Sequence, residues 1–356
     1  MKLKLALPSG SLNNSTRGNT NELFKTAGYQ ITGYEPGQEE FSPRIGNDPE
    51  LELLVDRPRD IPMQIDFGVY DAGILGLDAY KESGWEGMIQ EVCDLGYGRI
   101  RIVSAGPYPK GATTASVMQE YADYKSKPDS ERQLGPVRET RFPLKSLRVN
   151  KMLFRIATEY PLITKEWVDP LSRRIFFGQP AQIQAPWNPY NLDARLEIAV
   201  TTGKTEQKAR TGFADLIVEA TQSGRTLERA GLTVLDEIMT STARLYARTK
   251  DSWKEGKIRE VATMLMAATG AMKYMIVMNV PEDGLERVAN FLRTAGYCAK
   301  EPTVSRYNGN CSVETAIPRN EYPQAVRQLL MLGADDIYNS NTGAFVQRDA
   351  VKWRAK

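Results

Sequence analysis

The sequence predicts an α/β protein built from more than one domain. Its 356 residues are more than one ordinary domain holds and suit two or three domains. Near the start, Leu3, Leu5 and Leu7 alternate with polar or small residues, which is the period of a strand. Two further short runs, 51–55 and 70–75, also predict strands, with helical segments between them. Strands that alternate with helices favour an α/β sheet whose ligands bind at the strand ends.

Two irregular stretches interrupt this alternation in the middle of the chain. Residues 108–147 are rich in Pro, Gly, Ser, Lys, Glu and Gln and keep little hydrophobic periodicity, so we expect a surface insertion there. A second irregular stretch, 178–191, is rich in Pro, Gln and Asn. Between the two, residues 154–161 are interpreted as a strand that leads into a helix. Residues 214–220 predict a buried strand, followed by a tight loop and a helix.

The C-terminal part, from about Asp251, follows a different pattern. A helix to about residue 272 precedes a strand at 274–279 and a helix at 282–294, and segments of strand, helix and strand follow. We interpret this succession as the βαββαβ order of a small ferredoxin-like module. The apolar residues of the 282–294 helix recur at helical spacing, so we expect that stripe to be core.

The composition excludes several classes of function. Lys and Arg number 46 against 44 Asp and Glu, so no global field favours nucleic acid or an anionic membrane as partner. The chain has no histidine, which excludes histidine bases and histidine-bearing metal sites. Three cysteines without CxxC spacing disfavour a disulfide framework and a zinc site, and favour the reducing cytosol. Lys and Pro interrupt the N-terminus before a signal-peptide core forms, and the apolar stretch 261–280 falls short of a membrane span.

The loop after the 214–220 strand is the most informative short segment. The hydroxyls of residues 221–226, Gly224 and the amides at a helix start can surround a phosphate dianion. Arg225 adds a charge-assisted contact or points to water, and Glu219 suits a ribose diol or a magnesium ion held through water. A Ser/Thr/Gly turn after a strand is also an ordinary helix cap, so the segment alone leaves both readings open.

Several polar positions near the first strands have the same ambiguity. The small turn of residues 9–11 either binds a ligand or only reverses the chain. Gly73 allows a flat ligand to approach the backbone or serves packing, and Asp71 is either a ligand contact or a solvated carboxylate. Arg57, beside Arg59 and Asp60, holds phosphate oxygens or forms a surface ion pair.

Read together and in order, these segments resemble the ATP phosphoribosyltransferase family across nearly the whole chain. Residues 68–78, GVYDAGILGLD, are similar to the family's GVxDxGIxGxD signature, and residues 94–101 are similar to its DLGxGxCR segment. Residues 223–227 resemble the TGxTL element, the phosphoribosyl pyrophosphate loop of the family. Further matches are the opening turn at 5–12, the RPRDIP motif at 57–62, the segments 155–161, 203–206, 212–215 and 238–245, and 273–281, 302–305 and 332–334 in the regulatory domain of the long form.

The resemblance implies a fold and a domain division. The expected fold is a two-domain α/β catalytic core of the periplasmic-binding-protein type (type II), followed by a ferredoxin-like, ACT-like βαββαβ domain. Catalytic domain I would comprise residues 1–104 and 233–250, and catalytic domain II residues 105–232. The regulatory domain would comprise residues 251–356.

The resemblance also implies an activity. Ring nitrogen 1 of the adenine of ATP attacks the anomeric carbon of phosphoribosyl pyrophosphate and expels pyrophosphate, with magnesium present. That nitrogen carries a free lone pair, so the reaction suits a chain without histidine and relies on alignment and on neutralising the leaving group. The residues implied as catalytic are Glu219, Arg101 and Asp215. Phosphoribosyl pyrophosphate would contact Glu206, Glu219, Thr221, Gln222, Ser223, Gly224, Arg225 and Thr226, and ATP would contact Ser9, Gly10, Ser11, Arg57, Asp71, Gly73, Tyr97 and Arg101.

Regulation is implied in the same way. In the family the third domain binds histidine as feedback inhibitor, and the enzyme forms a homohexamer in equilibrium with smaller forms. Asn279, Thr303 and Ser305 lie in the motifs that match this effector site.

This chain departs from the family pattern at several positions. They are Ser9 for lysine, Glu219 for aspartate, Lys204 and Thr205 for Ser-Val, Ala230 for asparagine, and longer insertions at 108–147 and 173–202. Transfer to another nitrogenous acceptor, and a noncatalytic solute-binding or regulatory relative, are therefore the alternatives.

Overall fold

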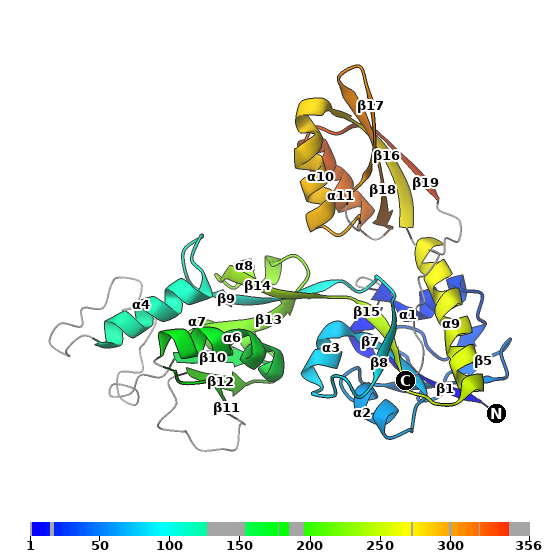
Figure 1. Cartoon of the computed structure of the whole chain (residues 1–356), viewed down its shortest axis with the longest axis horizontal. Helices are drawn as coiled ribbons and strands as arrows, with labels where there is room; N and C mark the ends of the chain where they lie inside the picture. The colour runs from blue at the N-terminus through cyan, green and yellow to red at the C-terminus, as the bar shows by residue number, and fades with distance from the viewer. Residues whose placement is uncertain are drawn as a thin grey trace. The chain divides into compact units, whose positions relative to one another are not determined.

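A computed structural model gives the arrangement of the chain (Figure 1) and describes residues 2–14, 18–126, 154–176, 178–184, 196–271, 273–298, 301–319 and 321–341. The chain divides into two compact units. The first comprises Met1–Leu75, Gly87–Tyr97 and Ala243–Lys356, and the second comprises Gly76–Glu86 and Gly98–Thr242.

The first unit is built on a five-stranded sheet. Its strand order is β6-β1-β7-β15-β8, in which β1 runs parallel to β6 and β7, and β15 runs antiparallel to β8. Helices α1 and α9 pack on one face against Leu3, Leu5 and Leu7. The strands are β1 (Leu3–Pro8), β6 (Leu51–Asp56), β7 (Ala72–Gly76), β8 (Gln90–Asp94) and β15 (Ala243–Ala247); the helices are η1 (Gly10–Leu12), α1 (Thr20–Thr26), α2 (Ile61–Asp66) and α9 (Ser252–Ala271); two small ribbons pair β2 (Asn13–Asn14) with β3 (Gly18–Asn19) and β4 (Ile31–Thr32) with β5 (Arg44–Ile45).

The second unit contains a six-stranded sheet in the order β11-β12-β10-β13-β9-β14. Helices α4 and α6 cover the face formed by Phe154, Ile156 and Val218, and helices α7 and α8 cover the face formed by Val103 and Ile217. Its elements are α3 (Leu77–Glu82), β9 (Ile100–Gly106), α4 (Thr114–Ser126), β10 (Phe154–Thr158), α6 (Pro161–Ile175), β11 (Gln182–Gln184), β12 (Leu196–Val200), α7 (Thr205–Arg210), β13 (Leu216–Thr221), α8 (Arg225–Arg229) and β14 (Thr233–Ser241).

The C-terminal module has the expected βαββαβ order. Its four strands form an antiparallel sheet in the order β17-β18-β16-β19, and helices α10 and α11 lie side by side on one face (Figure 1). Its elements are β16 (Lys273–Pro281), η3 (Glu282–Gly284), α10 (Leu285–Thr294), β17 (Thr303–Tyr307), β18 (Asn310–Pro318), α11 (Tyr322–Met331) and β19 (Asp335–Asn341). The expected α/β core with a ferredoxin-like module is therefore confirmed.

One stretch expected as irregular insertion is partly regular. Residues 114–126 form α4, whose Val117, Met118 and Ala122 are buried in the core of the second unit. The helix starts where Asp236, 122 positions further along the chain, accepts a hydrogen bond from the Thr114 amide at 2.8 Å. Within the second irregular stretch, β11 pairs with β12. The remainder of both insertions, 127–153 and 185–195, lies outside the described residues.

The contacts draw the domain limits differently from the sequence analysis. Strands β9 and β14 both belong to the second sheet. The chain leaves the first unit after Leu75, returns at Gly87, leaves again after Tyr97 and returns at Ala243. Helix α9 packs into the core of the first sheet through Ile258, Val261 and Leu265, although its sequence position suggested the third domain. Within the described part of the chain, none of the helices has the length and apolar character of a membrane span.

Candidate active site

The carboxyl edge of the second sheet gathers most of the residues expected for phosphoribosyl pyrophosphate. Strands β10, β12 and β13 run parallel, so the loops after Thr158, Val200 and Thr221 leave the same edge. Strand β12 lies on one side of β10 and β13 lies on the other, so the strand order reverses at β10. Open α/β sheets bind their ligands at such a reversal.

The loop 221–226 is built to expose polar groups at this edge. The Gly224 amide donates to the Thr221 hydroxyl at 2.9 Å, which closes a tight turn. Gly224 has φ +77°, a conformation that residues with a side chain rarely adopt. Gln222, Ser223, Arg225 and Thr226 are exposed around the buried Gly224.

Glu219 lies on β13 just before this loop. Burial raises the pKa of its carboxyl, as do the charges of Glu159 and Glu206, while hydrogen bonds from the Thr205 hydroxyl and the Ala220 amide lower that pKa. The Ala220 amide donates to Glu219 Oε1 at 3.1 Å. Glu159 after β10, Glu206 in the first turn of α7 after β12, and Glu219 on β13 therefore influence one another at the same edge.

Arg101 stands beside the loop in the neighbouring strand. It is opposite Thr221 in the antiparallel pairing of β9 with β13 and opposite Thr240 in the pairing of β9 with β14. Its guanidinium forms an ion pair with Glu237 at 3.2 Å, and 32% of its side chain is exposed. Strand pairing thus brings a cation to the start of the 221–226 loop.

Asp215 lies at the other end of the strand. It precedes β13, is buried, and accepts a hydrogen bond from the Arg155 amide at 2.8 Å. Thr221 is six positions further along β13, which corresponds to about 20 Å in an extended strand. Asp215 therefore joins the start of β13 to β10 and lies far from the loop.

In the first unit, the 9–11 turn and Arg57 share the carboxyl edge of the sheet. Pro8 and Asp56 are partners in the parallel pairing of β1 with β6, and the Ser9 amide donates to the Asp56 carbonyl at 2.9 Å. Gly10, Ser11 and Arg57 are exposed where these strands end.

Tyr97 is tied to the same region. Its hydroxyl shares a hydrogen bond with the Thr20 hydroxyl at 2.7 Å, and Thr20 in turn donates to the Leu12 carbonyl beside the turn. Burial raises the pKa of Tyr97, so it stays a neutral hydroxyl at physiological pH.

Asp71 and Gly73 have other partners. Asp71 accepts the Lys4 amide at 2.9 Å and holds the ammonium of Lys254 in α9 at 2.6 Å. A Cβ on Gly73 would lie 2.4 Å from Cγ2 of Ile61, so glycine makes room for α2 at this position. Both contacts are structural, and they favour the packing interpretation of Gly73.

The three effector candidates lie on the C-terminal sheet. Ser312 pairs with Asn279 on one side and with Ser305 on the other, so these residues form one row across three strands. Their neighbours Met278 and Val280 point into the helix-covered core, which leaves the row on the opposite face. Asn279 Nδ2 donates to Asp336 Oδ2 at 3.2 Å, and Thr303 pairs with Glu314 on the same sheet.

Two site residues were missed by the sequence analysis. Glu159 follows β10, accepts a hydrogen bond from the Gly203 amide, and acts on the pKa of Glu219. Thr205 begins α7 and donates to Glu219. Glu159 lies where the predicted strand of residues 154–161 leads into a helix, which was the available signal, since loops at parallel strand ends meet at one edge. The sequence analysis predicted no strand before Thr205.

The chain thus combines two α/β sheets, a polar glycine-containing loop at the end of one strand and a small C-terminal module. A family model described as ATP phosphoribosyltransferase matches residues 57–267, and one described as the HisG C-terminal domain matches residues 271–341. The chain belongs to the ATP phosphoribosyltransferase family, in the long form that carries the additional domain.

Individual relatives agree with this assignment. ATP phosphoribosyltransferase 1 of Geobacter sulfurreducens is 29% identical over 94% of this chain and 96% of its own length. ATP phosphoribosyltransferase of Haloarcula marismortui is 29% identical over 82% of this chain and 83% of its own length. The protein is thus a phosphoribosyltransferase of histidine biosynthesis. Among solved structures, the ATP phosphoribosyl transferase (HisG:HisZ) complex from Thermotoga maritima has a chain that is 21% identical, with a TM-score of 0.49 over 75% of this chain and 98% of that one.

Proposed function

We propose that this protein transfers the phosphoribosyl group of phosphoribosyl pyrophosphate to ring nitrogen 1 of the adenine of ATP. The bond from the anomeric carbon to pyrophosphate breaks, its electron pair leaves with pyrophosphate, and the nitrogen lone pair forms the new bond. Family membership supports the reaction. The proposed substrate site is supported by one observation: the 221–226 loop, Glu219 and Arg101 lie together at one edge of the sheet.

The residues divide between the two substrates by their chemistry. The 221–226 loop would hold the 5′-phosphate through amides and hydroxyls, and Glu219 would accept hydrogen bonds from the ribose hydroxyls. Arg101 would neutralise charge on the leaving pyrophosphate, where a guanidinium suits phosphate oxygens. ATP would lie against the turn of residues 9–11, Arg57 and Tyr97. Asp71, Gly73, Asp215 and Glu206 support these elements in the proposal and do not touch the reacting atoms.

Magnesium is the proposed metal. No group of three or more ligating side chains gathers in the described part of the chain, so a cage made by the protein alone does not account for it. Magnesium usually keeps several waters and binds through one or two carboxylates together with substrate phosphates. Glu159 and Glu219, whose charges repel each other at this edge, fit that requirement. When bound, the ion neutralises the pyrophosphate.

Regulation follows from the C-terminal module. We propose that histidine binds there through Asn279, Thr303 and Ser305 and lowers activity in a homohexamer that exchanges with smaller forms. An inhibitor acts in this way when it favours an assembly that catalyses poorly. The proposal also places the enzyme in the cytosol, where its three free cysteines stay reduced.

The test is the formation of phosphoribosyl-ATP, followed by its ultraviolet absorbance, from phosphoribosyl pyrophosphate, ATP and magnesium. We expect product formation that depends on ATP and is suppressed by histidine. Pyrophosphate release with another base in place of ATP would point to a different acceptor. Binding of both substrates without turnover would contradict the proposal in favour of a noncatalytic role.

A further inference from the structure

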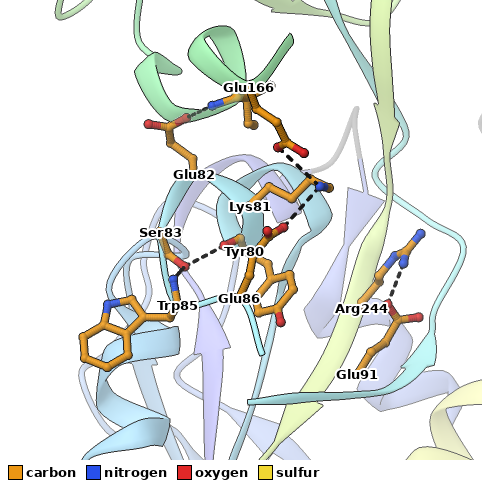
Figure 2. A network of polar contacts seen from close by, with 10 residues as sticks. Tyr80, Lys81, Glu82, Ser83, Trp85, Glu86, Glu91, Glu166 and Arg244 are labelled. Atoms are coloured by element: carbon orange, nitrogen blue, oxygen red, sulfur yellow. Dashed lines mark hydrogen bonds and ion pairs between the residues drawn. The ribbon is translucent and has the colours of Figure 1, made fainter. Parts of the chain in front are cut away.

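Helix α6 begins at a carboxylate that comes from a distant part of the chain. Both oxygens of Glu82, the last residue of α3, lie 3.1 Å from the Leu162 amide, and Oε2 also lies 3.1 Å from the Ile163 amide. Figure 2 shows the Glu82 carboxylate at the first turn of α6. Helices α3 and α6 belong to the same compact unit.

The helix depends on this contact because it lacks a cap of its own. Its N-cap residue, Tyr160, makes no capping hydrogen bond with its side chain, and Pro161 occupies the first turn. The first amides of a helix need acceptors from outside the helix, and a carboxylate also interacts favourably with the helix dipole. Glu82 supplies both, from 80 positions earlier in the chain.

The segment just before α6 is part of the candidate active site. The Thr158 hydroxyl donates to the Val218 carbonyl at 2.9 Å and accepts the Tyr160 amide at 2.8 Å, which joins this turn to β13. Glu159 accepts a hydrogen bond from the Gly203 amide, which joins the same turn to the loop after β12. A shift in the start of α6 would therefore move Glu159 and the turn that is bonded to β13 one residue before Glu219.

We propose that Glu82 is a positioning residue for the phosphoribosyl pyrophosphate site. By holding the first turn of α6, its carboxylate fixes the 158–160 turn, which carries Glu159 and is bonded to β13 at Val218, one residue before Glu219. The inference rests on the proposed function for the identity of the ligand, and it assigns Glu82 no contact with either substrate.

The occupied helix end has a second consequence. An uncapped helix start attracts phosphate groups. In α6 the Glu82 carboxylate already fills that position, so its amides are not available to the substrate. The proposal accordingly places the phosphate at the loops of the sheet edge, and Glu82 acts on affinity only through geometry.

The experiment compares Glu82→Gln and Glu82→Ala with the wild-type full chain. Calorimetry gives the Kd of phosphoribosyl pyrophosphate with magnesium, and steady-state kinetics gives the KM of each substrate. If the 158–160 turn is correctly formed in a tenth of the molecules, the apparent Kd rises about tenfold. We expect that rise for Glu82→Ala and a smaller one for Glu82→Gln, which keeps one acceptor, while the KM of ATP changes less than about twofold.

The matched control is Lys81→Gln in the same helix. Lys81 forms ion pairs with Glu86 at 3.1 Å and Glu166 at 3.8 Å, the second of these also bridging α3 and α6. Exposed pairs of this kind contribute little, so both KM values should stay at the wild-type level. Thermal unfolding and hydrogen exchange of residues 158–166 show whether each variant is folded and whether its α6 start has loosened.

The outcomes separate this inference from the proposed function. An unchanged Kd in both Glu82 variants, or equal increases in the KM of ATP and of phosphoribosyl pyrophosphate, would overturn the role of Glu82. Wild-type protein that binds phosphoribosyl pyrophosphate but makes no phosphoribosyl-ATP would overturn the function alone, since the Kd comparison still applies. Wild-type protein that does not bind phosphoribosyl pyrophosphate would overturn both.

Discussion

Arg101 lies directly opposite Thr221 in the antiparallel pairing of β9 with β13. Directly opposed residues in such a pair have Cβ atoms about 5 Å apart on the same face of the sheet. The guanidinium of Arg101 therefore belongs to the face that carries Glu219 and the start of the 221–226 loop. The guanidinium forms an ion pair with the partly exposed carboxylate of Glu237.

Replacing this cation should impair turnover more than stability. We expect Arg101→Gln to lower kcat/KM by about a hundredfold, because a fixed donor to developing negative charge is lost. Steady-state kinetics with both substrates measures the loss. Arg173→Gln, an exposed arginine on α6, is the control and should leave kinetics unchanged. Wild-type kcat/KM in Arg101→Gln would remove Arg101 from the catalytic residues.

Gly224 tests whether the loop depends on its left-handed backbone. A Cβ at this position meets only Val234 Cγ2, at 3.9 Å, so Gly224→Ala strains the backbone at φ +77° without a steric clash. We expect a loss of about 1 kcal/mol in stability together with a large increase in the KM of phosphoribosyl pyrophosphate.

Gly231→Ala provides a matched control for this strain. Gly231 has φ +73° and lies just beyond the other end of α8, and a Cβ added to it would meet no heavy atom within 4 Å. It should lose similar stability but keep its substrate KM. If both variants retain the wild-type KM, the 221–226 loop is not the phosphate site.

The sequence predicted the parts of the fold that depend on local pattern. The strand before the 221–226 loop and the βαββαβ order of the C-terminal module both follow from short apolar periods, and both are present. Helix α4 was missed because its start is capped by Asp236, which is distant in sequence, and because its composition is largely polar.

The candidate site was predictable only in part, for a related reason. A motif names residues but does not say at which end of a strand each one lies. Asp71 and Gly73 occur in a signature that resembles a ligand site, yet Asp71 pairs with Lys254, and a Cβ on Gly73 would collide with Ile61. Conversely, the place of Arg101 beside Thr221 depends on the register of strands that are far apart in the chain.

Glu219 should make the protein less stable when it is ionised. Burial raises its pKa in the folded state, so the folded state favours the protonated form. The stabilisation from this group is complete below the pKa of the unfolded chain and is lost as the pH rises through the folded pKa. At a pH above neutral, Glu219→Gln should therefore raise the apparent Tm by about 2 °C. Near about pH 4 the same substitution should leave the Tm unchanged.

Thermal unfolding at the two pH values measures this difference, and the exposed Glu228→Gln on α8 serves as control with an unchanged Tm. The same Glu219→Gln variant should bind phosphoribosyl pyrophosphate more weakly, since the amide cannot accept from the ribose hydroxyls on both atoms. If the wild-type protein is more stable than Glu219→Gln at high pH, the pKa of Glu219 is not raised in the folded state.

Asp71 distinguishes a structural role from contact with ATP. Its carboxylate joins the Lys4 amide of β1 to Lys254 of α9, so Asp71→Asn weakens a partly buried charged hydrogen bond. We expect a loss of about 2 kcal/mol in stability, with the KM of ATP changed less than about twofold. Lys254→Met should produce a similar loss, and the double variant should lose less than the sum, because both changes remove one interaction. A large rise in the KM of ATP at unchanged stability would instead place Asp71 against the nucleotide and leave Lys254 as its counter-ion.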